Sequence, residues 1–361
     1  MRAAVLNQVG DTKLELRDDV RTVDVGEREI RIRVRATGVC HSDLSAMDGT
    51  LPALAPGVLG HEGAGEVLEV GPRVDHLAVG DHVALTFVPP CGTCVNCRSR
   101  RPHLCAVHSI AAFTSPRFLV GDTPAFGYAG TGTFAEELVV PADGAVKIDE
   151  DVPFEIAALV ACGVMTGVGA VVNTAKVEPG ASVLVIGCGG VGISVIQGAR
   201  LAGAATIVAV DPVADKHGTA IRFGATHAVS PERLADTHAS LTGSQGFDHA
   251  FDVVGAPATI RSAWDNARRG GTVVVVGAGR GDATVQFSAQ ELFLHDKRLL
   301  GSFYGGADVH RDYPRLLALW RSGRLDLDGM ISRRIRLEEI NEGLQALRAG
   351  GTLIRQLVTF G

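Results

Sequence analysis

The stretch SVLVIGCGGVGISVIQGARLAG, residues 182–203, constrains the fold of this chain more than any other part of its sequence. It opens with an aliphatic run, continues through closely spaced glycines and ends in a segment of helical character. Similar aliphatic runs follow it, namely TIVAV, HAFDVV and TVVVVG. Near-continuous apolar strands are typical of a parallel sheet buried on both faces, and the segments between them predict covering helices. The sequence therefore predicts a doubly wound α/β domain.

The glycines of this stretch, Gly187, Gly189 and Gly192, have GxGxxG spacing between a strand and a helix. In that context the first permits a tight turn, the second lets backbone approach a pyrophosphate, and the third allows close helix–strand packing. The next strand ends in Asp211, 19 residues after Gly192, where a carboxylate binds ribose hydroxyls and repels a 2′-phosphate. We therefore expect an NAD site. The alternative is a packing turn followed by an Asp that caps a helix.

The two ends of the chain have a different sequence pattern from the aliphatic runs in its middle. Before about residue 150 the sequence reads as short strands, such as residues 29–39, broken by glycine and proline turns, which indicates a small barrel-like β domain. After about residue 303 the aliphatic pattern ends, and the last strand-like piece is LIRQLVTF. At 361 residues the chain exceeds the size of one hydrophobic core. The domains expected are a first domain at 1–163, a nucleotide-binding domain at 164–302 and the rest of the first domain at 303–361.

The composition narrows the classes of function. A net charge of −6 argues against nucleic acid as the main partner, because phosphate binding needs a basic face. The short basic runs RSRR (98–101) and RR (333–334) are interpreted as solvated surface. No apolar run is expected to reach membrane-spanning length, and the first residues lack the pattern of a signal peptide. We expect a cytoplasmic protein without a membrane partner.

Four of the seven cysteines lie within fifteen residues, in the stretch CGTCVNCRSRRPHLC. In a reducing compartment such a cluster favours metal ligation over disulfides. Four thiolates can close a tetrahedral shell around zinc, which leaves no vacancy for substrate and indicates a structural site. The alternatives are an iron–sulfur cluster and, less favoured, a redox CxxC pair. The ligands of this expected site are Cys91, Cys94, Cys97 and Cys105.

The other cysteines are spread along the chain. Cys188 lies inside the glycine loop, where a small filler residue is sufficient, whereas Cys40 and Cys162 lie in GVCHSD and ACGVMTG. Between these two comes GHEGAGEV, with His61 and Glu62. Each residue alone has a simple explanation as a buried thiol, a hydrogen-bonded histidine or a solvated acid. Two cysteines and a histidine would also suit a catalytic zinc with three protein ligands and one open position.

Together these motifs resemble a known family. GVCHSD, GHEGAGEV, the four-cysteine segment, ACGVMTG, IGCGGVG and the terminal LIRQLVTF occur in the order and approximate spacing of the zinc-dependent medium-chain alcohol dehydrogenases. The resemblance covers essentially the whole chain. It implies a GroES-like catalytic domain around a Rossmann domain, with NAD and two zinc ions per chain, the structural one in a lobe at 89–106. It places the catalytic zinc on Cys40, His61 and Cys162, with Glu62 beside the metal.

The resemblance also implies roles for other residues. Asp43 matches a carboxylate that orients the zinc-binding histidine, and Ser42 matches a hydroxyl that accepts the proton of the alcohol. The residues implied at the cofactor are His41, Thr166, Gly187, Gly189, Gly190, Val191, Gly192, Asp211, Lys216, Gly277 and Arg355. Of these, His41 and Arg355 would lie at its pyrophosphate. The residues implied at the substrate channel are Phe87, Leu104, Ala278 and Phe303.

The reaction that the resemblance implies is reversible oxidation of an alcohol to an aldehyde. The alkoxide gives a hydride to the nicotinamide, and Ser42 passes the proton outward. Many family members have a histidine five residues after the first zinc-binding cysteine, where this chain has Ser45. Because serine does not store a proton near neutral pH, we expect the relay to end in water or another group. The apolar channel residues favour a primary alcohol or aldehyde with an apolar or aromatic body.

Three other functions remain open. The first is a dehydrogenase of the thiol adduct of formaldehyde, although residues 48–61 lack the acidic pair expected near a glutathione adduct. The second is a biosynthetic reductase of the same family. The third is a non-catalytic binding protein, which is disfavoured because every residue implied at the catalytic zinc is present. The length of segment 106–133 favours a homodimer, and the strand-rich stretch 271–287 lies where family dimers join their sheets.

Overall fold

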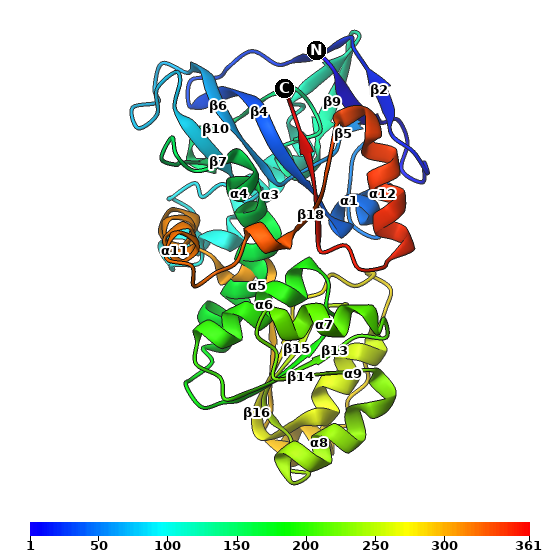
Figure 1. Cartoon of the computed structure of the whole chain (residues 1–361). Helices are drawn as coiled ribbons and strands as arrows, with labels where there is room; N and C mark the ends of the chain where they lie inside the picture. The colour runs from blue at the N-terminus through cyan, green and yellow to red at the C-terminus, as the bar shows by residue number, and fades with distance from the viewer. The chain divides into compact units, whose positions relative to one another are not determined.

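The computed structural model describes residues 1–361, and the chain divides into two compact units. Unit 1 comprises residues 1–162, 308–321 and 327–361, and unit 2 comprises residues 163–307 and 322–326. Both termini belong to unit 1, so unit 2 is inserted into its sequence (Figure 1). The boundaries drawn from the sequence differ from these by one residue at the first junction and by five at the second, and they do not include the return of 322–326 to unit 2.

Unit 1 contains two sheets. The first has the strand order β2-β1-β5-β9-β8-β3, and the second has the order β11-β7-β6-β4-β19-β18, with β10 also paired to β4. Its strands are β1 (Ala3–Leu6), β2 (Glu15–Arg17), β3 (Val20–Thr22), β4 (Glu29–Val39), β5 (Gly57–Val58), β6 (Gly63–Val70), β7 (His82–Leu85), β8 (Phe118–Val120), β9 (Thr123–Gly127), β10 (Glu137–Pro141), β11 (Ala145–Lys147), β18 (Ile331–Ile335) and β19 (Arg355–Thr359).

Strand β4 is the centre of the second sheet and pairs with β6, β10 and β19. Its first half alternates buried Ile30, Ile32 and Val34 with more exposed arginines, which is the period-2 pattern of a strand with one face on the core. Its last residues are buried on both faces. Because β19 comes from the end of the chain, its antiparallel pairing with β4 joins the C-terminal segment to the N-terminal domain.

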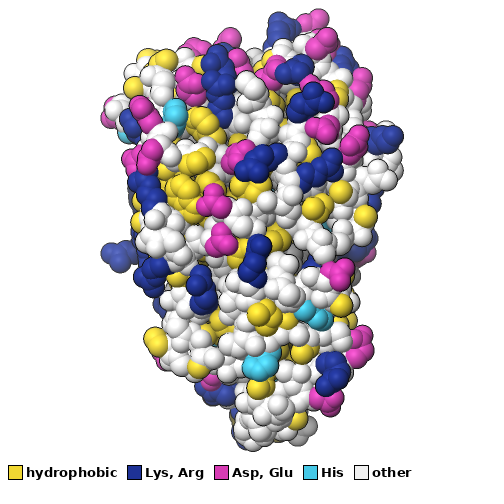
Figure 2. Space-filling model, viewed as in Figure 1, with side chains coloured by type: hydrophobic (Ala, Val, Ile, Leu, Met, Phe, Trp, Pro, Cys, Tyr) yellow, Lys and Arg dark blue, Asp and Glu magenta, His cyan; other side chains and the backbone are white.

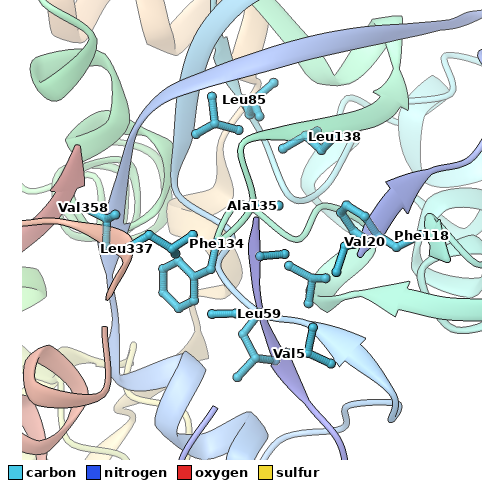
Figure 3. Close-up of a cluster of buried hydrophobic side chains, with 14 of the residues drawn as sticks. Val5, Val20, Leu59, Leu85, Phe118, Phe134, Ala135, Leu138, Leu337 and Val358 are labelled. Atoms are coloured by element: carbon cyan, nitrogen blue, oxygen red, sulfur yellow. The ribbon is translucent and has the colours of Figure 1, made fainter. Parts of the chain in front are cut away.

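The core of unit 1 is formed by side chains from both ends of the chain. In Figure 3 Phe134, Leu59 and Val5 lie against one another, and Leu337 and Val358 approach from the C-terminal segment. All five are nearly inaccessible to solvent. Burial of a large apolar side chain contributes about 1.5–3 kcal/mol, so this cluster is a main reason why the separated parts of unit 1 stay together.

The helices of unit 1 are short and flank the sheets. They are α1 (His41–Met47), α2 (Val95–Arg98), α3 (Ala106–Thr114), α4 (Phe154–Leu159), α11 (Val309–Arg321) and α12 (Ile340–Ala349). Helix α4 begins the longer helical segment Phe154–Ala175, whose 22 residues have a mean hydropathy of 2.0 over their most apolar window. By length and composition this segment could cross a membrane, so the expectation that no apolar run is long enough is wrong. Because 83% of that window is buried inside the protein, it has the character of a core helix.

Unit 2 is built on one parallel sheet with the strand order β14-β13-β12-β15-β16-β17. Numbered within the unit this order is 3-2-1-4-5-6, which is the order of the doubly wound Rossmann fold. Its strands are β12 (Ser182–Ile186), β13 (Thr206–Val210), β14 (His227–Val229), β15 (Phe247–Asp252), β16 (Ala267–Val275) and β17 (Arg298–Gly301). Its helices are α5 (Met165–Gly169), α6 (Gly190–Leu201), α7 (Asp215–Arg222), α8 (Leu234–Thr242), α9 (Pro257–Asn266) and α10 (Ala289–His295).

The stretch 271–287 was expected to be rich in strand and to lie where family dimers join their sheets. The stretch 271–287 supplies the end of β16, which is paired on both sides, and no strand follows it before residue 288. Strand β17 is the edge instead, because the chain after residue 275 leaves the sheet and returns through α10. On the face of the molecule in Figure 2, acidic and basic side chains are interspersed, which agrees with the modest net charge.

Candidate metal centres and dinucleotide site

Four potential metal ligands come together inside unit 1 although they are far apart in the sequence. One ligand atom each from Cys40, His61, Glu62 and Cys162 lies within 4.8 Å of the others, and all four residues are buried. Cys40 follows β4, and His61 and Glu62 directly precede β6. We call this set the buried cluster. The structure therefore brings together all the residues that the sequence suggested for a catalytic metal.

Cys162 reaches the buried cluster from an irregular part of a helix. Residues Val160–Val164 form a π-helical turn between α4 and α5. A π turn places one extra residue in the helix and turns the side chains there away from their regular positions, and such turns are frequent at functional sites. The local backbone thus explains how a residue in a long core helix presents its thiol to ligands from the β domain.

Asp43 fixes the orientation of His61. Its carboxylate lies 3.1 Å from His61 Nδ1 and accepts backbone N–H groups of Cys40 at 3.0 Å and Gly60 at 3.1 Å. Asp43 is fully buried, so three hydrogen bonds take the place of its hydration. With Nδ1 bound to the carboxylate, His61 Nε2 is buried without a hydrogen-bond partner, as is Oε1 of Glu62. A cation among these atoms would satisfy both.

The charges of the buried cluster favour a bound cation. Burial lowers the pKa of His61, but Asp43 and Cys40 outweigh burial and raise it to about 10. Hydrogen bonding from Cys162 brings the pKa of the Cys40 thiol well below its usual value, against the effect of burial. The raised pKa of His61 reflects the carboxylate and thiol beside it, and the lowered pKa of Cys40 reflects hydrogen bonds from Cys162 and His61 with the positive charges of His61 and Arg355. Zinc in catalytic sites takes two thiolates and an imidazole as ligands in a tetrahedral shell with one open position. The residues of the buried cluster therefore fit that metal.

Arg355 lies against the buried cluster. Its guanidinium forms an ion pair with Glu62, and both side chains are buried. A Cβ on Gly38 would overlap the Glu62 carboxylate and approach the arginine, so a larger residue there would push the pair apart. The resemblance implied a role for Arg355 at the cofactor pyrophosphate. In the structure Arg355 also holds the Glu62 carboxylate in place beside the thiols, and its role at the cofactor stays a prediction.

Two aromatic rings flank His61. Phe87 and Tyr128 each meet its ring edge-on, with centroids 5.4 Å apart. Phe87 was expected near the substrate, whereas Tyr128, in the short helix η2 (Tyr128–Gly130), was not. Burial, followed by the charges of Asp43, Cys40 and Cys162, raises the pKa of the Tyr128 hydroxyl, which therefore stays protonated. The sequence signal for Tyr128 is weak, because it lies 67 residues from His61 in a glycine-rich stretch without a recognised motif.

The residues that follow Cys40 occupy the start of α1. Ser42 Oγ lies 3.7 Å from Cys40 Sγ, so its hydroxyl belongs to the surroundings of the buried cluster. Ser45 is one turn further on and is half-buried, whereas His41 is exposed at the first helical position. The Ser42 hydroxyl, which is expected to accept the proton of the alcohol, thus lies close to the buried cluster. The first turn of α1 places it there.

A second group of ligands lies in the lobe that follows β7. The sulfurs of Cys91, Cys94, Cys97 and Cys105, which we call the lobe cluster, lie within 4.8 Å of one another. Cys91 Sγ accepts the backbone N–H of Cys94 at 3.3 Å, and Cys105 Sγ accepts that of Cys91 at 3.4 Å. Burial raises the pKa of Cys91, but hydrogen bonds from Thr93 and Cys94 outweigh it and lower it to about 6. Four converging thiols with N–H donors fit a closed zinc shell.

In unit 2 the glycine loop has the geometry of a phosphate cradle. Gly187 has φ +101°, which favours glycine. A Cβ on Gly192 would come 1.9 Å from the carbonyl oxygen of Gly187, whereas one on Gly189 would meet nothing within 4 Å. The loop is thus closed on its packing side and open at Gly189, from which Gly190 and Val191 lead into α6. A helix N-terminus behind an open glycine loop is a suitable site for a pyrophosphate.

Asp211 lies directly after β13 and is bound to the same loop. Its carboxylate accepts the N–H of Cys188 at 2.9 Å and of Val213 at 3.0 Å, and Lys216 Nζ lies 3.4 Å away. Burial, followed by the charge of Asp211, raises the pKa of the Cys188 thiol to about 12. Cys188 is therefore a neutral loop residue, and Asp211 is a fixed negative charge at the end of the second strand.

The remaining candidate residues lie in both units. In unit 2, Gly277 and Ala278 follow β16 and pack against Gly255, where a Cβ on Gly277 would come 2.3 Å from a backbone nitrogen. Thr166 lies in α5, and Phe303, after β17, is 53% exposed. In unit 1, Leu104 is in the lobe and 37% exposed. Gly277 and Ala278 thus lie at the carboxyl end of the parallel strands, where ligands bind in open α/β sheets.

Comparisons with known proteins agree with this architecture. Residues 26–150 match the alcohol dehydrogenase GroES-like domain, and residues 190–322 match the zinc-binding dehydrogenase domain. The chain is 39% identical over 362 residues to an NDMA-dependent alcohol dehydrogenase of Amycolatopsis methanolica, covering 97% of this chain and 96% of the relative. It is 35% identical to S-(hydroxymethyl)glutathione dehydrogenase of Paracoccus denitrificans over 99% of both chains.

A solved structure of an alcohol dehydrogenase is also similar to this chain over its whole length. Benzyl alcohol dehydrogenase from Acinetobacter calcoaceticus superimposes with a TM-score of 0.91 and 30% identity, covering 100% of this chain and 99% of that one. The likeness therefore extends through both units and is not confined to one motif. This chain belongs to the zinc-dependent medium-chain alcohol dehydrogenase family.

Proposed function

We propose that this protein catalyses the NAD-linked, zinc-dependent and reversible oxidation of a primary alcohol with an apolar or aromatic body to the aldehyde. The family makes it an oxidoreductase of the alcohol dehydrogenase type. The observation that carries the finer proposal is the buried cluster, in which His61 Nε2 is oriented by Asp43 and left without a partner among two thiols. Such a site has three ligands and a vacancy for a substrate oxygen.

The residues of unit 1 have distinct tasks in this reaction. Cys40, Cys162 and His61 hold the metal, which when bound supplies a Lewis acid that lowers the pKa of a hydroxyl toward neutrality. Asp43 holds one proton of His61 on Nδ1, so that Nε2 would offer its lone pair to a metal that displaces the second proton. Ser42 accepts the proton of the alcohol and passes it outward.

The residues of unit 2 bind the hydride acceptor. The open loop at Gly189 and the first turn of α6 receive the pyrophosphate. Asp211, whose position is fixed by two backbone hydrogen bonds, accepts hydrogen bonds from the adenosine ribose. Because a 2′-phosphate would meet this carboxylate, we expect NAD to be preferred over NADP.

The side chains next to the metal site favour an apolar substrate. Phe87 and Tyr128 flank His61 with their rings, and the Tyr128 hydroxyl remains protonated. The likeness to a benzyl alcohol dehydrogenase also favours an aromatic body. A relative named for S-(hydroxymethyl)glutathione keeps the thiol adduct of formaldehyde as the second candidate, and a biosynthetic reductase of the same family as the third.

A substrate panel with metal analysis tests the proposal. Purified protein should contain two zinc ions per chain and should reduce NAD, but not NADP, with benzyl or medium-chain alcohols. NDMA belongs in the panel as an alternative acceptor, since one relative is named for its dependence on it. Turnover confined to a charged thiol adduct would overturn the apolar substrate, and equal rates with NADP would overturn the role of Asp211.

For the assembly and location we propose a cytoplasmic homodimer joined through the edge of the parallel sheet. Strand β17 has only one partner in this sheet, and an edge strand offers unpaired backbone groups to a second copy. Leu299 on this strand and Phe293 on α10 are 42% and 82% exposed. Light scattering should give twice the chain mass, and Leu299→Lys should shift it to the monomer. A wild-type monomer would contradict the proposal.

A further inference from the structure

The main chain at Asp211, after the second strand of unit 2, has an unusual constraint. Pro212 follows it and has no backbone N–H, so the peptide group between the two residues has only one hydrogen-bonding atom, the Asp211 carbonyl oxygen. The parallel ladder of β13 ends one residue earlier, at Val210, and no backbone N–H donates to this oxygen. Asp211 is only 4% exposed. A carbonyl oxygen in such a place needs a donor from a side chain.

That donor is the imidazole of His217. Its Nε2 lies 2.8 Å from the Asp211 carbonyl oxygen. Because a carbonyl oxygen only accepts hydrogen bonds, Nε2 carries the hydrogen. His217 is half-buried and lies in the first turn of α7, the helix that follows β13. The helix thus returns a side chain to the end of the strand before it and fixes the one peptide group there that lacks its own donor.

The other polar groups of Asp211 are held by backbone. Its carboxylate accepts the N–H of Cys188, in the glycine loop, at 2.9 Å and the N–H of Val213 at 3.0 Å. Its own N–H donates to the carbonyl oxygen of Val229 in β14 at 3.2 Å. Every polar group of Asp211 therefore has a partner, and His217 supplies the contact that fixes the peptide after it.

We propose that His217 is a positioning residue for the cofactor: it holds the main chain of Asp211 so that the carboxylate keeps the place that favours NAD over NADP. This inference rests on the proposed function, in which Asp211 binds the adenosine ribose. A ribose hydroxyl needs an acceptor at a fixed place, and a 2′-phosphate is excluded only if the carboxylate cannot turn away. Loss of the imidazole would free the Asp211–Pro212 peptide to rotate, and both effects of the carboxylate would weaken.

A role of His217 in the stability of α7 alone would give a different result. The start of this helix is formed by backbone bonds, from the N–H of Lys216 to Val213 and from the N–H of His217 to Ala214, both at 3.0 Å. Alanine also has a higher helix propensity than histidine, so the helix should form without the imidazole. A general loss of stability would weaken the binding of NAD and NADP alike. The ratio of their dissociation constants therefore separates positioning from stability.

The test is isothermal titration calorimetry of the zinc-loaded, full-length protein with NAD and with NADP, followed by steady-state kinetics with benzyl alcohol. His217→Ala should raise the dissociation constant for NAD about five- to ten-fold, the usual effect of one lost hydrogen bond, without raising that for NADP. The preference for NAD should fall by at least the same factor. KM for NAD should rise in parallel, and kcat should not fall, because the imidazole acts on Asp211 and not on the reacting atoms.

Conservative variants show whether the donor itself matters. His217→Gln places an amide N–H near the position of Nε2 and should keep the dissociation constant for NAD within about two-fold of wild type. His217→Asn, whose amide reaches only as far as Nδ1, should bind NAD like the alanine variant. His227→Ala is the matched control, because this exposed imidazole at the start of β14 contacts Thr226 and not Asp211, and it should bind like wild type.

Two results would overturn the inference while the proposed function stands. One is wild-type affinity for NAD in the alanine variant, and the other is an equal loss for NADP without recovery in the glutamine variant. If the wild-type protein bound no NAD, the proposed cofactor would fail and this inference with it. That result comes from the wild type alone, so the two failures are distinguishable.

Discussion

The two metal centres of unit 1 are built in opposite ways. The lobe cluster takes four cysteines from fifteen consecutive residues, half-buried and supported by nearby backbone N–H groups. The buried cluster takes its ligands from positions 40 to 162, in three separate segments: the end of β4, the residues before β6 and the helical segment after α4. Four thiolates in the lobe cluster would close a metal shell, whereas the two thiolates and the imidazole of the buried cluster would leave one position open. Under the proposed function the conspicuous lobe cluster supports the fold, and the reaction takes place at the buried cluster, whose assembly depends on tertiary structure.

The largest effect expected from this comparison follows removal of a ligand from the buried cluster. Cys162→Ser or His61→Ala should lower kcat/KM by at least about a thousand-fold, because the metal and its charge stabilisation are lost together. The zinc content should fall from two per chain to one, with little change in melting temperature. Cys188→Ala is the control for zinc content, since this buried cysteine belongs to neither cluster. Full activity of the His61 variant would contradict the assignment.

Loss of a ligand from the lobe cluster should lower the stability of the protein more than its activity. Cys97→Ser should also leave one zinc per chain, but its main effect should be on stability, with a fall in melting temperature of roughly 10 °C because metal binding contributes folding free energy. The fraction that stays folded should keep kcat within about ten-fold. Calorimetry with zinc analysis measures both quantities. A variant with normal melting temperature and no activity would mean that the lobe takes part in catalysis.

A substitution of Asp43 tests how the fold supports the buried cluster. Asp43→Asn keeps the shape but removes the charge that fixes the His61 proton on Nδ1, so zinc affinity or kcat/KM should fall by about 10- to 100-fold. Competition with a chelator should release one zinc earlier than in wild type. The zinc of the lobe cluster is the internal control, since Asp43 does not contact it. Equal release of both ions would show a general loss of stability instead.

The lobe cluster is built from local sequence and the buried cluster from distant segments, and this difference decides how well the sequence predicts each of them. Strand β4 was predicted with its observed bounds because alternation within one strand is a local property, and the lobe cluster was visible for the same reason. The ligands of the buried cluster were found only through several motifs taken together. Tyr128 and the ion pair of Arg355 with Glu62 were missed, because both contacts join segments that are distant in the chain.

A smaller effect is expected at Ser45, where the chain departs from the family pattern. If the proton relay from Ser42 ends in water, Ser45→His should raise hydride transfer by a few-fold below neutral pH and shift its pH profile, because an imidazole can hold the proton there. Single-turnover kinetics with NAD between pH 6 and 9 measures this change. Ser45→Ala is the matched control and should leave the profile as in wild type. An unchanged profile for the histidine variant would contradict the relay.

The smallest effect should come from a single hydrogen bond across the lobe. Asn96 donates its side-chain amide to the carbonyl oxygen of Leu104 at 2.5 Å, which joins the residue before the third cysteine to the residue before the fourth. Asn96→Ala should cost about 1 kcal/mol of lobe stability, seen as earlier thermal release of one zinc. Activity at 25 °C should be unchanged, since this bond touches no residue of the buried cluster. If activity fell with zinc still bound, the lobe would control the shape of the catalytic site, and the separation of the two centres into support and reaction would have to be given up.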